Sequence, residues 1–326
     1  MKLTFKNFFI LALLLMVCSL NSAQTISKNP YGFKDIDFAD KLIRMGAGPK
    51  GGLIYPIAES ICILINKNTD YSKVRCVLIE TPGSEFNVMG IGNGSFEVAI
   101  SQGDNLVRMT AEQDDGPTPL RLVSVLGYAP INLYVKNSIN SIDDLKGKKY
   151  NANLRGSGHA ASGEDFLNVA KLNGQNFNST VRIPPSEIGK EFCNQNIDFG
   201  IFTGPHPLPL FNEIYKCNGK LLEIPKEMLD SMKENVPTSK EVQISKGIYS
   251  NFNQEMTSLA VPLVLISSDQ TDNEAIYRVV KVLKNNFELF RSKFPYLSKQ
   301  LSTLEEMKEL NFEMHDGAIQ ALSNSN

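Results

Sequence analysis

Short apolar segments rich in β-branched residues alternate along this chain with segments whose apolar residues recur at helical spacing. The helical spacing is clearest at 55–66 and 274–290, where apolar residues fall three or four positions apart. The segments expected to form strands are residues 41–48, 74–80, 96–103, 196–204 and 258–268. Because strands that alternate with helices form parallel β-α-β units, the sequence predicts an α/β fold.

One β-rich segment is unusually long. Residues 120–136, LRLVSVLGYAPINLYVK, form a long β-rich run that is interrupted by Gly127 and Pro130. We interpret this segment as a strand that passes from one lobe of the protein to another. The length of 326 residues agrees with two lobes, because each would be large enough to bury a core of its own.

The N-terminus has the pattern of a secretory signal peptide. Lys2 and Lys6 precede an apolar run, and small and polar residues follow it up to Ala23. The run from Phe8 to Leu20 is about 13 residues, short of the roughly 20 that a membrane-spanning helix needs. We therefore expect residues 1–23 to be removed and the protein to be periplasmic, and a retained membrane anchor is the alternative.

Charge and cysteine content narrow the classes of partner. The formal net charge of −2 argues against a nucleic-acid partner, which usually requires a basic surface. No cysteine or histidine spacing indicates a metal site, and we expect no cofactor. If Cys18 leaves with the signal peptide, four cysteines remain, namely Cys62, Cys76, Cys193 and Cys217. They allow two disulfides in three possible pairings, of which Cys193–Cys217 is attractive, and buried free thiols are the alternative.

A glycine-rich stretch carries the strongest indication of a binding site. Residues 155–165, RGSGHAASGED, follow an expected strand and begin an expected helix. They lack the Gly-Lys-Ser of a phosphate-binding P-loop and the Gly-x-Ser-x-Gly of a hydrolase elbow, and Ser157 with His159 has no orienting carboxylate nearby. A helix that starts after flexible glycines offers unpaired N–H groups to an anion. The simpler alternative is a strand-to-helix turn capped by Ser157.

Five separated segments resemble the TAXI-type solute receptors of TRAP transporter systems. The resemblance covers nearly the whole chain after the signal peptide, and each segment alone is weak. Ile54 and Asp316 depart from the family pattern, which commonly has an aromatic residue and a proline there. The segments are GGLIYPIAESICILINKN (51–68), TPGSEFNVMGIGNGSFEVAISQGDN (81–105), INSIDDLKGKKYNANLRGSGHAASG (139–163), IDFGIFTGPHPLPLF (197–211) and MHDGAIQAL (314–322).

The resemblance implies a two-lobed, periplasmic-binding-protein-like fold of type II with the ligand in the interlobe cleft. Lobe one would contain residues 24–129 and 251–326, and lobe two residues 130–250. A ligand that contacts both lobes would favour the closed form over the open form. The protein would be a monomeric receptor that is not an enzyme. It would capture a small organic anion, a dicarboxylate or a glutamate-like amino acid, and deliver it to a TRAP-type sodium-driven permease.

The expected ligand-binding residues lie beyond the carboxyl ends of strands, where open α/β sheets bind ligands. Ser157 and the loop N–H groups would hold a carboxylate, Tyr55 would wall the pocket, and His159 would add charge at mildly acidic pH. For Tyr55 and Gln102 a purely structural role is an equal alternative. The full set is Gly51, Gly52, Tyr55, Ser84, Asn87, Gln102, Gly156, Ser157, Gly158, His159, Thr203 and Gly204.

Two further interpretations stay open at this point. One is a surface-exposed or antigenic interaction protein that kept the receptor fold and lost its ligand, which we would favour if Tyr55 and Ser157 faced no common cleft. The other is an exported enzyme on a similar scaffold, which requires a nucleophile dyad or an acid–base pair in the cleft. The sequence shows no convincing pair of that kind.

Overall fold

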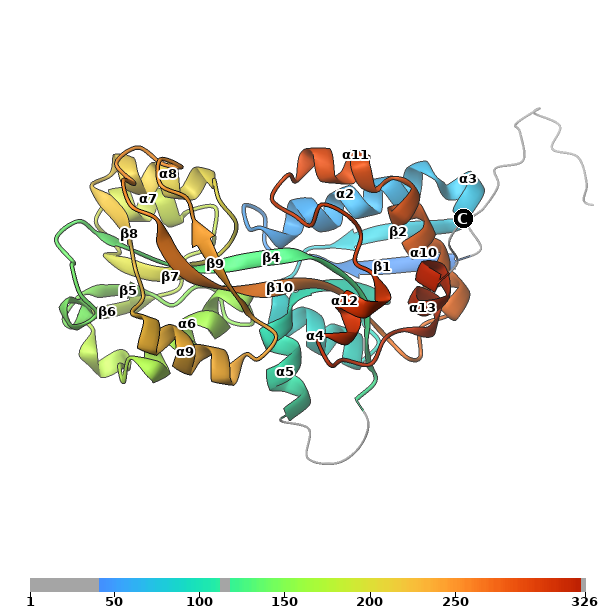
Figure 1. The fold of residues 1–326 in the computed structure, drawn as a ribbon, viewed down its shortest axis with the longest axis horizontal. Helices are drawn as coiled ribbons and strands as arrows, with labels where there is room; N and C mark the ends of the chain where they lie inside the picture. The colour runs from blue at the N-terminus through green and yellow to red at the C-terminus, as the bar shows by residue number, and fades with distance from the viewer. Residues whose placement is uncertain (1–40, 112–117, 324–326) are drawn as a thin grey trace, which may run out of the picture. The chain divides into compact units, whose positions relative to one another are not determined.

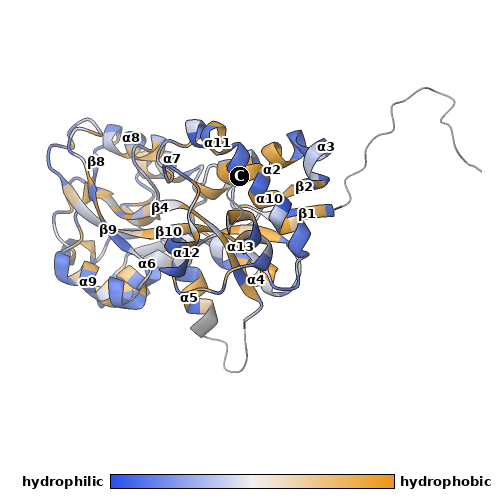
Figure 2. Cartoon of the chain, turned by 45° about the vertical axis from the view of Figure 1, so that its right-hand side comes forward, coloured by the Kyte–Doolittle hydropathy of each residue, from blue (hydrophilic) through white to orange (hydrophobic). Residues whose placement is uncertain are grey.

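The computed structural model of the chain describes residues 41–111 and 118–323 (Figure 1). The expected signal peptide at 1–23 lies outside the described residues. None of the helices within the described ranges has the length and apolar character that spanning a membrane requires. Apolar residues concentrate on the central strands and on the helix faces turned toward them, and hydrophilic residues on the outer faces (Figure 2).

Lobe one is built on a sheet with parallel strands at one edge. β1 (Lys41–Gly46) lies between β2 (Val74–Ile79) and β3 (Val98–Gln102), and both neighbours run parallel to it. The sheet continues from β3 to two long strands, β10 (Met256–Ser268) and β4 (Leu120–Lys136), which pair antiparallel.

Helices cover both faces of this sheet. One face packs on α2 (Ile54–Lys67), α10 (Asn273–Asn285), α11 (Phe287–Lys293) and α13 (Asp316–Ser323), and the other on α4 (Ser84–Gly92), α5 (Gly103–Ala111) and α12 (Leu304–Lys308). The short α3 (Thr69–Ser72) follows α2. In Figure 1, α2 and α11 lie above the strands, and α4 and α5 below them. The sheet is thus buried on both sides, as its apolar strands predict.

Lobe two repeats this arrangement on a smaller sheet. β5 (Lys149–Asn151) pairs in parallel with β6 (Ser179–Val181) and β7 (Phe199–Thr203). β8 (Gly219–Leu222) pairs with β4, and β9 (Lys240–Ile244) with β10. One apolar core includes α6 (Gly158–Val169) and α9 (Lys226–Asn235), and another includes α7 (Ile188–Cys193) and α8 (Pro209–Lys216).

The two long strands β4 and β10 join the lobes. β4 pairs with β10 up to Pro130 and with β7 from Ile131 onward, so it crosses between the lobes as the sequence predicts. Residues 256–260 of β10 pair with β9 of lobe two. The lobe boundaries stay a prediction, but this pairing favours a second crossing near Ala260 rather than at residue 250.

The crossing lacks two backbone donors, because Pro130 and Pro262 stand in the two strands and proline has no N–H group. The side chain of Asn132 supplies hydrogen bonds at this crossing. The Asn132 amide donates to the carbonyl oxygens of Pro130, Phe202 and Gly204 at 2.9 to 3.0 Å.

The predicted strands and the helix at 55–66 are confirmed, with ends shifted by a few residues. The expected single helix at 274–290 is wrong in one respect, because it is two helices divided at Asn286. The Asn286 side-chain amide donates to the Val282 carbonyl oxygen at 2.8 Å, which caps the end of α10. Asparagine competes in this way for backbone groups and so favours helix ends.

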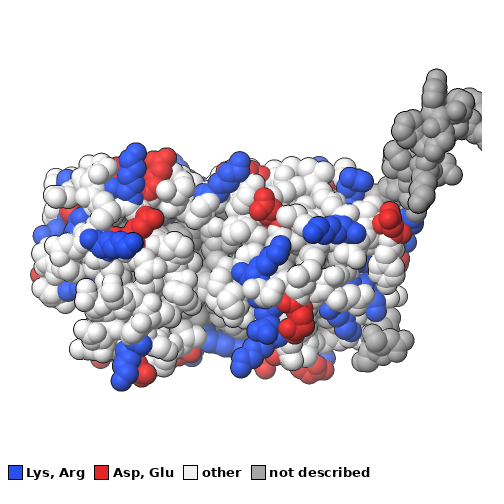
Figure 3. Space-filling view, turned by 90° about the horizontal axis from the view of Figure 1, so that it is seen from above, with Lys and Arg blue, Asp and Glu red and all other residues white. Residues whose placement is uncertain are grey.

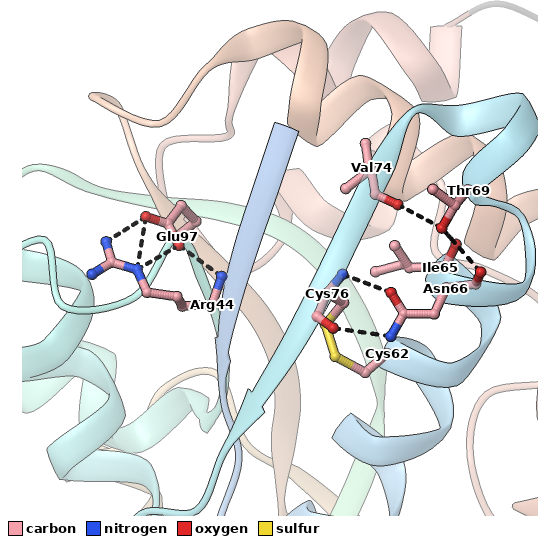
Figure 4. Close-up of a disulfide and its surroundings, with 8 residues drawn as sticks. All are labelled: Arg44, Cys62, Ile65, Asn66, Thr69, Val74, Cys76 and Glu97. Atoms are coloured by element: carbon pink, nitrogen blue, oxygen red, sulfur yellow. Dashed lines mark hydrogen bonds and ion pairs between the residues drawn. A yellow bond between two sulfur atoms is a disulfide. The ribbon is translucent and has the colours of Figure 1, made fainter. Parts of the chain in front are cut away.

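Each lobe contains one disulfide. Cys62–Cys76 ties α2 to β2, and the neighbouring Asn66 amide exchanges two hydrogen bonds with the Cys76 backbone, at 2.8 and 2.9 Å (Figure 4). Cys193–Cys217 joins the ends of α7 and α8. The structure therefore selects the favoured Cys193–Cys217 pairing over free thiols. Both bridges hold a lobe together internally and leave the lobes free to move relative to each other.

Candidate functional site

Three helix N-termini meet at a small cavity between the lobes, which we call the inner cavity. Its walls come from residues 52–54 at the start of α2, Gly83 and Ser84 at the start of α4, residues 157–159 at the start of α6, and Gln102 at the end of β3. Its volume is about 20 Å³, enough for roughly one water molecule. No lysine, arginine, aspartate or glutamate lines it.

The lobes approach each other closely around the inner cavity. A Cβ atom at Gly158 of lobe two would overlap Gln102 Oε1 of lobe one and would lie 2.8 Å from Ser84 Oγ. The Phe86 N–H of lobe one donates to the Gly156 carbonyl oxygen of lobe two at 3.2 Å. Gly156 itself has φ +76°, a conformation that glycine adopts without strain. These contacts require the lobes to be closed.

Gln102 has an unsatisfied polar atom at the cavity. Its side chain is 2% exposed, and Oε1 has no hydrogen-bond partner within the described residues. Its backbone N–H donates to Ser84 Oγ at 3.1 Å, which joins the end of β3 to the start of α4. A buried polar group without a partner is costly, so this amide points to a ligand or water at the cavity.

The role predicted for Ser157 needs correction. Its hydroxyl donates to the Leu154 carbonyl oxygen at 2.7 Å and accepts the Ala160 N–H at 3.2 Å, so it caps α6 and has no proton left for a ligand. Ser84 is better placed. Its oxygen accepts from Gln102, and no acceptor for its own proton is present in the described part of the chain.

The charge predicted for His159 is also corrected. Burial lowers the pKa of His159 to about 4, so the ring is neutral at mildly acidic pH. Nδ1 accepts the Thr203 N–H at 3.2 Å, which places the single proton of the neutral ring on Nε2. The ring stacks on Phe202 with centroids 4.0 Å apart.

Other predicted residues support the site without lining the inner cavity. The Asn87 amide donates to the carbonyl oxygens of Ala47 and Ile100 and accepts from Thr81, so it ties strand ends together inside lobe one. Thr203 orients His159 from behind. The Gly204 N–H donates to the Pro130 carbonyl oxygen at 2.8 Å, at the strand crossing. Gly156 contacts lobe one through its carbonyl group.

A second, larger cavity adjoins the first, and we call it the outer cavity. Gly51, Gly52 and Tyr55 line it, so it collects the predicted residues of the first glycine loop. Its volume is about 530 Å³. From lobe two it receives Phe202 and residues 208–210 at the start of α8. The hollow that Figure 3 shows between the lobes is bordered mainly by uncharged residues.

A charged contact between α5 and α6, hereafter the α5–α6 contact, also joins the lobes. Arg108 of α5 forms an ion pair with Asp165 of α6 at 2.8 Å. Asp104 of α5 accepts from Ser162 of α6 at 3.3 Å, and Ser162 bonds Thr203 at 3.1 Å. Burial raises the pKa of Asp104 to about 6, against the opposing effect of Arg108.

The sequence did not indicate the α5–α6 contact, because Arg108 and Asp165 lie 57 positions apart and each is an ordinary charged residue on a helix. Residues 41–111 and 118–323 contain no group of three or more His, Cys, Asp or Glu side chains placed to hold a metal ion.

Comparison with known proteins agrees with this geometry. Residues 45–324 match the NMT1-like family. No protein with a curated function matches the chain.

Solved structures share the fold at low sequence identity. PhnD1 from Prochlorococcus marinus, in complex with methylphosphonate, is 11% identical with a TM-score of 0.52 over 83% of this chain and 95% of PhnD1. A structure described as a periplasmic transporter is 13% identical with a TM-score of 0.53 over 88% and 98% of the two chains. The periplasmic binding protein BugD is 11% identical with a TM-score of 0.50 over 87% and 93%. The fold is that of two-lobed periplasmic binding proteins.

Proposed function

The chain belongs to the NMT1-like family and has the fold of periplasmic binding proteins, and from this premise we propose that it is an extracytoplasmic receptor for a small organic anion. The receptor closes its two lobes around the anion and delivers it to a membrane permease. Its place of action is the periplasm, in agreement with the predicted signal peptide.

The observation that carries this proposal is the convergence of three helix N-termini on an uncharged cavity. α2, α4 and α6 direct their N-terminal ends toward the inner cavity, and no acidic side chain lines it. The N–H groups of a first helical turn lack partners within the helix, and the helix dipole favours negative charge there. Three such ends favour an oxyanion without any lysine or arginine.

Lobe closure is supported by the contacts across the inner cavity. Both lobes contribute to its wall, so an anion held there touches the Ser84 hydroxyl on one side and the start of α6 on the other. A ligand that interacts with both lobes binds the closed form more tightly than the open form, and this difference drives closure.

The identity of ligand and permease rests on sequence resemblance. The five segments shared with TAXI-type receptors support a dicarboxylate or glutamate-like ligand and a TRAP-type sodium-driven permease. PhnD1, solved with methylphosphonate, supports the general point that this fold accommodates an oxyanion. The assignment of the permease can be tested by measuring uptake of the identified ligand by cells with and without the receptor, in sodium and in potassium buffer. Uptake that does not require sodium would contradict the TRAP assignment.

The alternative functions have less support. An enzyme requires an acid–base pair or a nucleophile dyad, and His159 is the only side chain with an ordinary titrating group among those lining the inner cavity. The interpretation as an interaction protein without a ligand is favoured only if Tyr55 and Ser157 face no common cleft. Tyr55 lines the outer cavity and Ser157 the inner one, and the two cavities share Gly52 and Leu53.

A thermal-shift screen of residues 24–326 against organic acids and amino acids tests the proposal. A ligand at 100 times its dissociation constant adds about 2.7 kcal/mol to the free energy of unfolding. The stabilisation should weaken in Ser84→Ala and stay unchanged in the matched control Ser292→Ala, whose serine is exposed on α11. Absence of stabilisation by any anion, with stabilisation by a neutral or cationic compound, would overturn the proposal.

A further inference from the structure

We infer that the ligand is an amphiphilic monoanion, with an oxyanion head in the inner cavity and an apolar body of ring size in the outer cavity. This inference rests on the proposed receptor function and names the class of anion. It differs from a dicarboxylate, which has a charge at each end.

The two cavities share a wall that is only one residue thick. On lobe one, Gly52 and Leu53 line both cavities. On lobe two, His159 lines the inner cavity, and Phe202, on which its ring stacks, lines the outer one. We therefore place the part of the ligand that joins its head to its body beside Leu53 and the stacked rings of His159 and Phe202.

The two cavities differ so much in size that they cannot hold the same part of an organic acid. The inner cavity has about 20 Å³, which suits part of a headgroup such as one carboxylate oxygen. The outer cavity has about 530 Å³, within the range of sites that hold small organic molecules. The remainder of an anion bound at the helix N-termini has to lie in the outer cavity.

The outer cavity has an apolar lining. Leu53, Pro56, Pro185, Phe202, Leu208 and Leu210 contribute to it, with Tyr55 and Tyr296 at its sides. Its charged side chains are Lys50 and Glu213, of opposite sign and both exposed. Lys50 is paired with Glu80 at 3.6 Å.

This lining gives a second negative charge little compensation, because its cationic side chain, Lys50, is exposed and already paired with Glu80. A carboxylate moved from water into apolar surroundings without a partner loses its hydration, which costs more than the contacts return. An aromatic or branched alkyl group instead removes apolar surface from water, which favours binding. The outer cavity therefore distinguishes an aryl or alkyl acid from a dicarboxylate that shares the same head.

Isothermal titration with acetate, phenylacetate and succinate on the purified protein tests the inference. Phenylacetate should bind at least about tenfold more tightly than acetate, because its ring buries apolar area. Succinate should gain nothing over acetate. The variant Leu210→Gln changes a half-buried residue of the outer cavity, and Leu289→Gln changes an exposed leucine on α11 as a matched control.

The expected result is that Leu210→Gln removes most of the advantage of phenylacetate and leaves acetate unchanged, while Leu289→Gln alters neither. Succinate binding as tightly as phenylacetate would overturn the amphiphilic ligand and leave the anion receptor in place. If none of the three anions binds and a neutral compound does, the receptor proposal fails together with this inference. The comparison of the three anions on the unaltered protein decides the question even if Leu210→Gln does not fold.

Discussion

The lobes meet in two regions that differ in chemistry. Around the inner cavity the contact consists of glycines, serines, backbone groups and one amide, without a charged side chain. At the α5–α6 contact, Asp104, Arg108 and Asp165 lie between the lobes. The neutral region has the three helix N-termini at which we propose the anion binds, whereas the side chains of the charged region do not line the inner cavity. In the proposed receptor, the residues that would hold the anion therefore differ from the charged residues that also join the lobes.

This separation of the two contact regions would let the proposed receptor select its ligand and still open again to release it. A fixed positive side chain in the cavity would hold any anion, whereas helix N-termini act only at short range and in one direction. Because the side chains of the α5–α6 contact line neither cavity, we expect the contact to affect closure equally whichever ligand is bound. Its strength sets how far closure is favoured once a ligand is present.

The largest effect on the neutral region is expected from Gly158→Ala. The added methyl group overlaps Gln102 Oε1 and crowds Ser84 Oγ, so either the lobes stay apart or both side chains leave their positions at the cavity. Overpacking of this kind costs about 1–3 kcal/mol, which is up to about a hundredfold in affinity. Titration of the identified ligand measures it.

The melting temperature of ligand-free Gly158→Ala is the control, because helix position and φ are compatible with alanine. Unchanged affinity in a variant that folds normally would show that the lobes need not approach as closely as they do here.

A smaller effect, dependent on pH, is expected from Asp104→Asn in the charged region. In the closed structure, burial raises the pKa of Asp104 to about 6 from 3.8. We expect opening to return water to this carboxylate, because its partner Ser162 on lobe two then moves away, so the closed form should bind a proton more readily than the open form. Ligand affinity should therefore be highest below about pH 4 and fall as pH rises to about 6. The aspartate-to-asparagine change removes this loss, so the variant should bind more tightly than the unaltered protein at pH 7.5, by at least about tenfold, because each pKa unit between the closed and open forms changes the affinity about tenfold.

The measurement is the dissociation constant at pH 4.5, 6 and 7.5 for both proteins. Other groups facing Asp104 are Arg108, which lowers its pKa, and Asp165, whose own pKa burial also raises. A residual slope of the same sign in Asp104→Asn is therefore expected from Asp165. Weaker binding of the variant at pH 7.5 would contradict the assigned cause.

Ser157→Ala should separate stability from affinity. The serine caps α6 and has no proton free for a ligand, so its loss should lower the free energy of unfolding by about 1 kcal/mol and change affinity by less than about threefold. Denaturant unfolding and ligand titration of the same sample measure the two quantities. A loss of affinity larger than that of Ser84→Ala would reverse the roles assigned to the two serines.

The smallest effect on affinity is expected from the disulfides, which lie in neither contact region. Replacing Cys193 and Cys217 by serine removes a bridge that spans 24 positions and should cost about 3 kcal/mol of stability. The dissociation constant should stay the same, because the bridge constrains only lobe two. Changed affinity at a temperature where the variant is folded would mean that α7 and α8 transmit strain to the outer cavity.

Sequence patterns predicted what depends on local periodicity. The strands, the helix at 55–66 and the strand crossing at β4 follow from apolar spacing, and residues 157–159 of the glycine-rich stretch line the inner cavity, where their role in ligand binding stays a prediction. The break at Asn286 was missed, because the apolar spacing continues across it.

What the sequence did not predict depends on where side chains point. A serine between glycines has a hydroxyl, but only the structure shows that Leu154 accepts the proton of Ser157. Likewise His159 carries no sign of its burial against Phe202. The outer cavity brings together residues near 50, 185, 202 and 210, and no local pattern connects segments so far apart.

Each of the strands β4 and β10 extends into both lobes, and this bears on the mechanics of opening. A hinge made of loops rotates freely, whereas two hydrogen-bonded strands resist bending and return to their original shape. We expect the bending to concentrate at Pro130 and Pro262, where the two strands lack a backbone N–H donor. We expect the residues beside the two prolines to keep their ladder hydrogen bonds during opening, so that the lobes separate without local unfolding of the hinge.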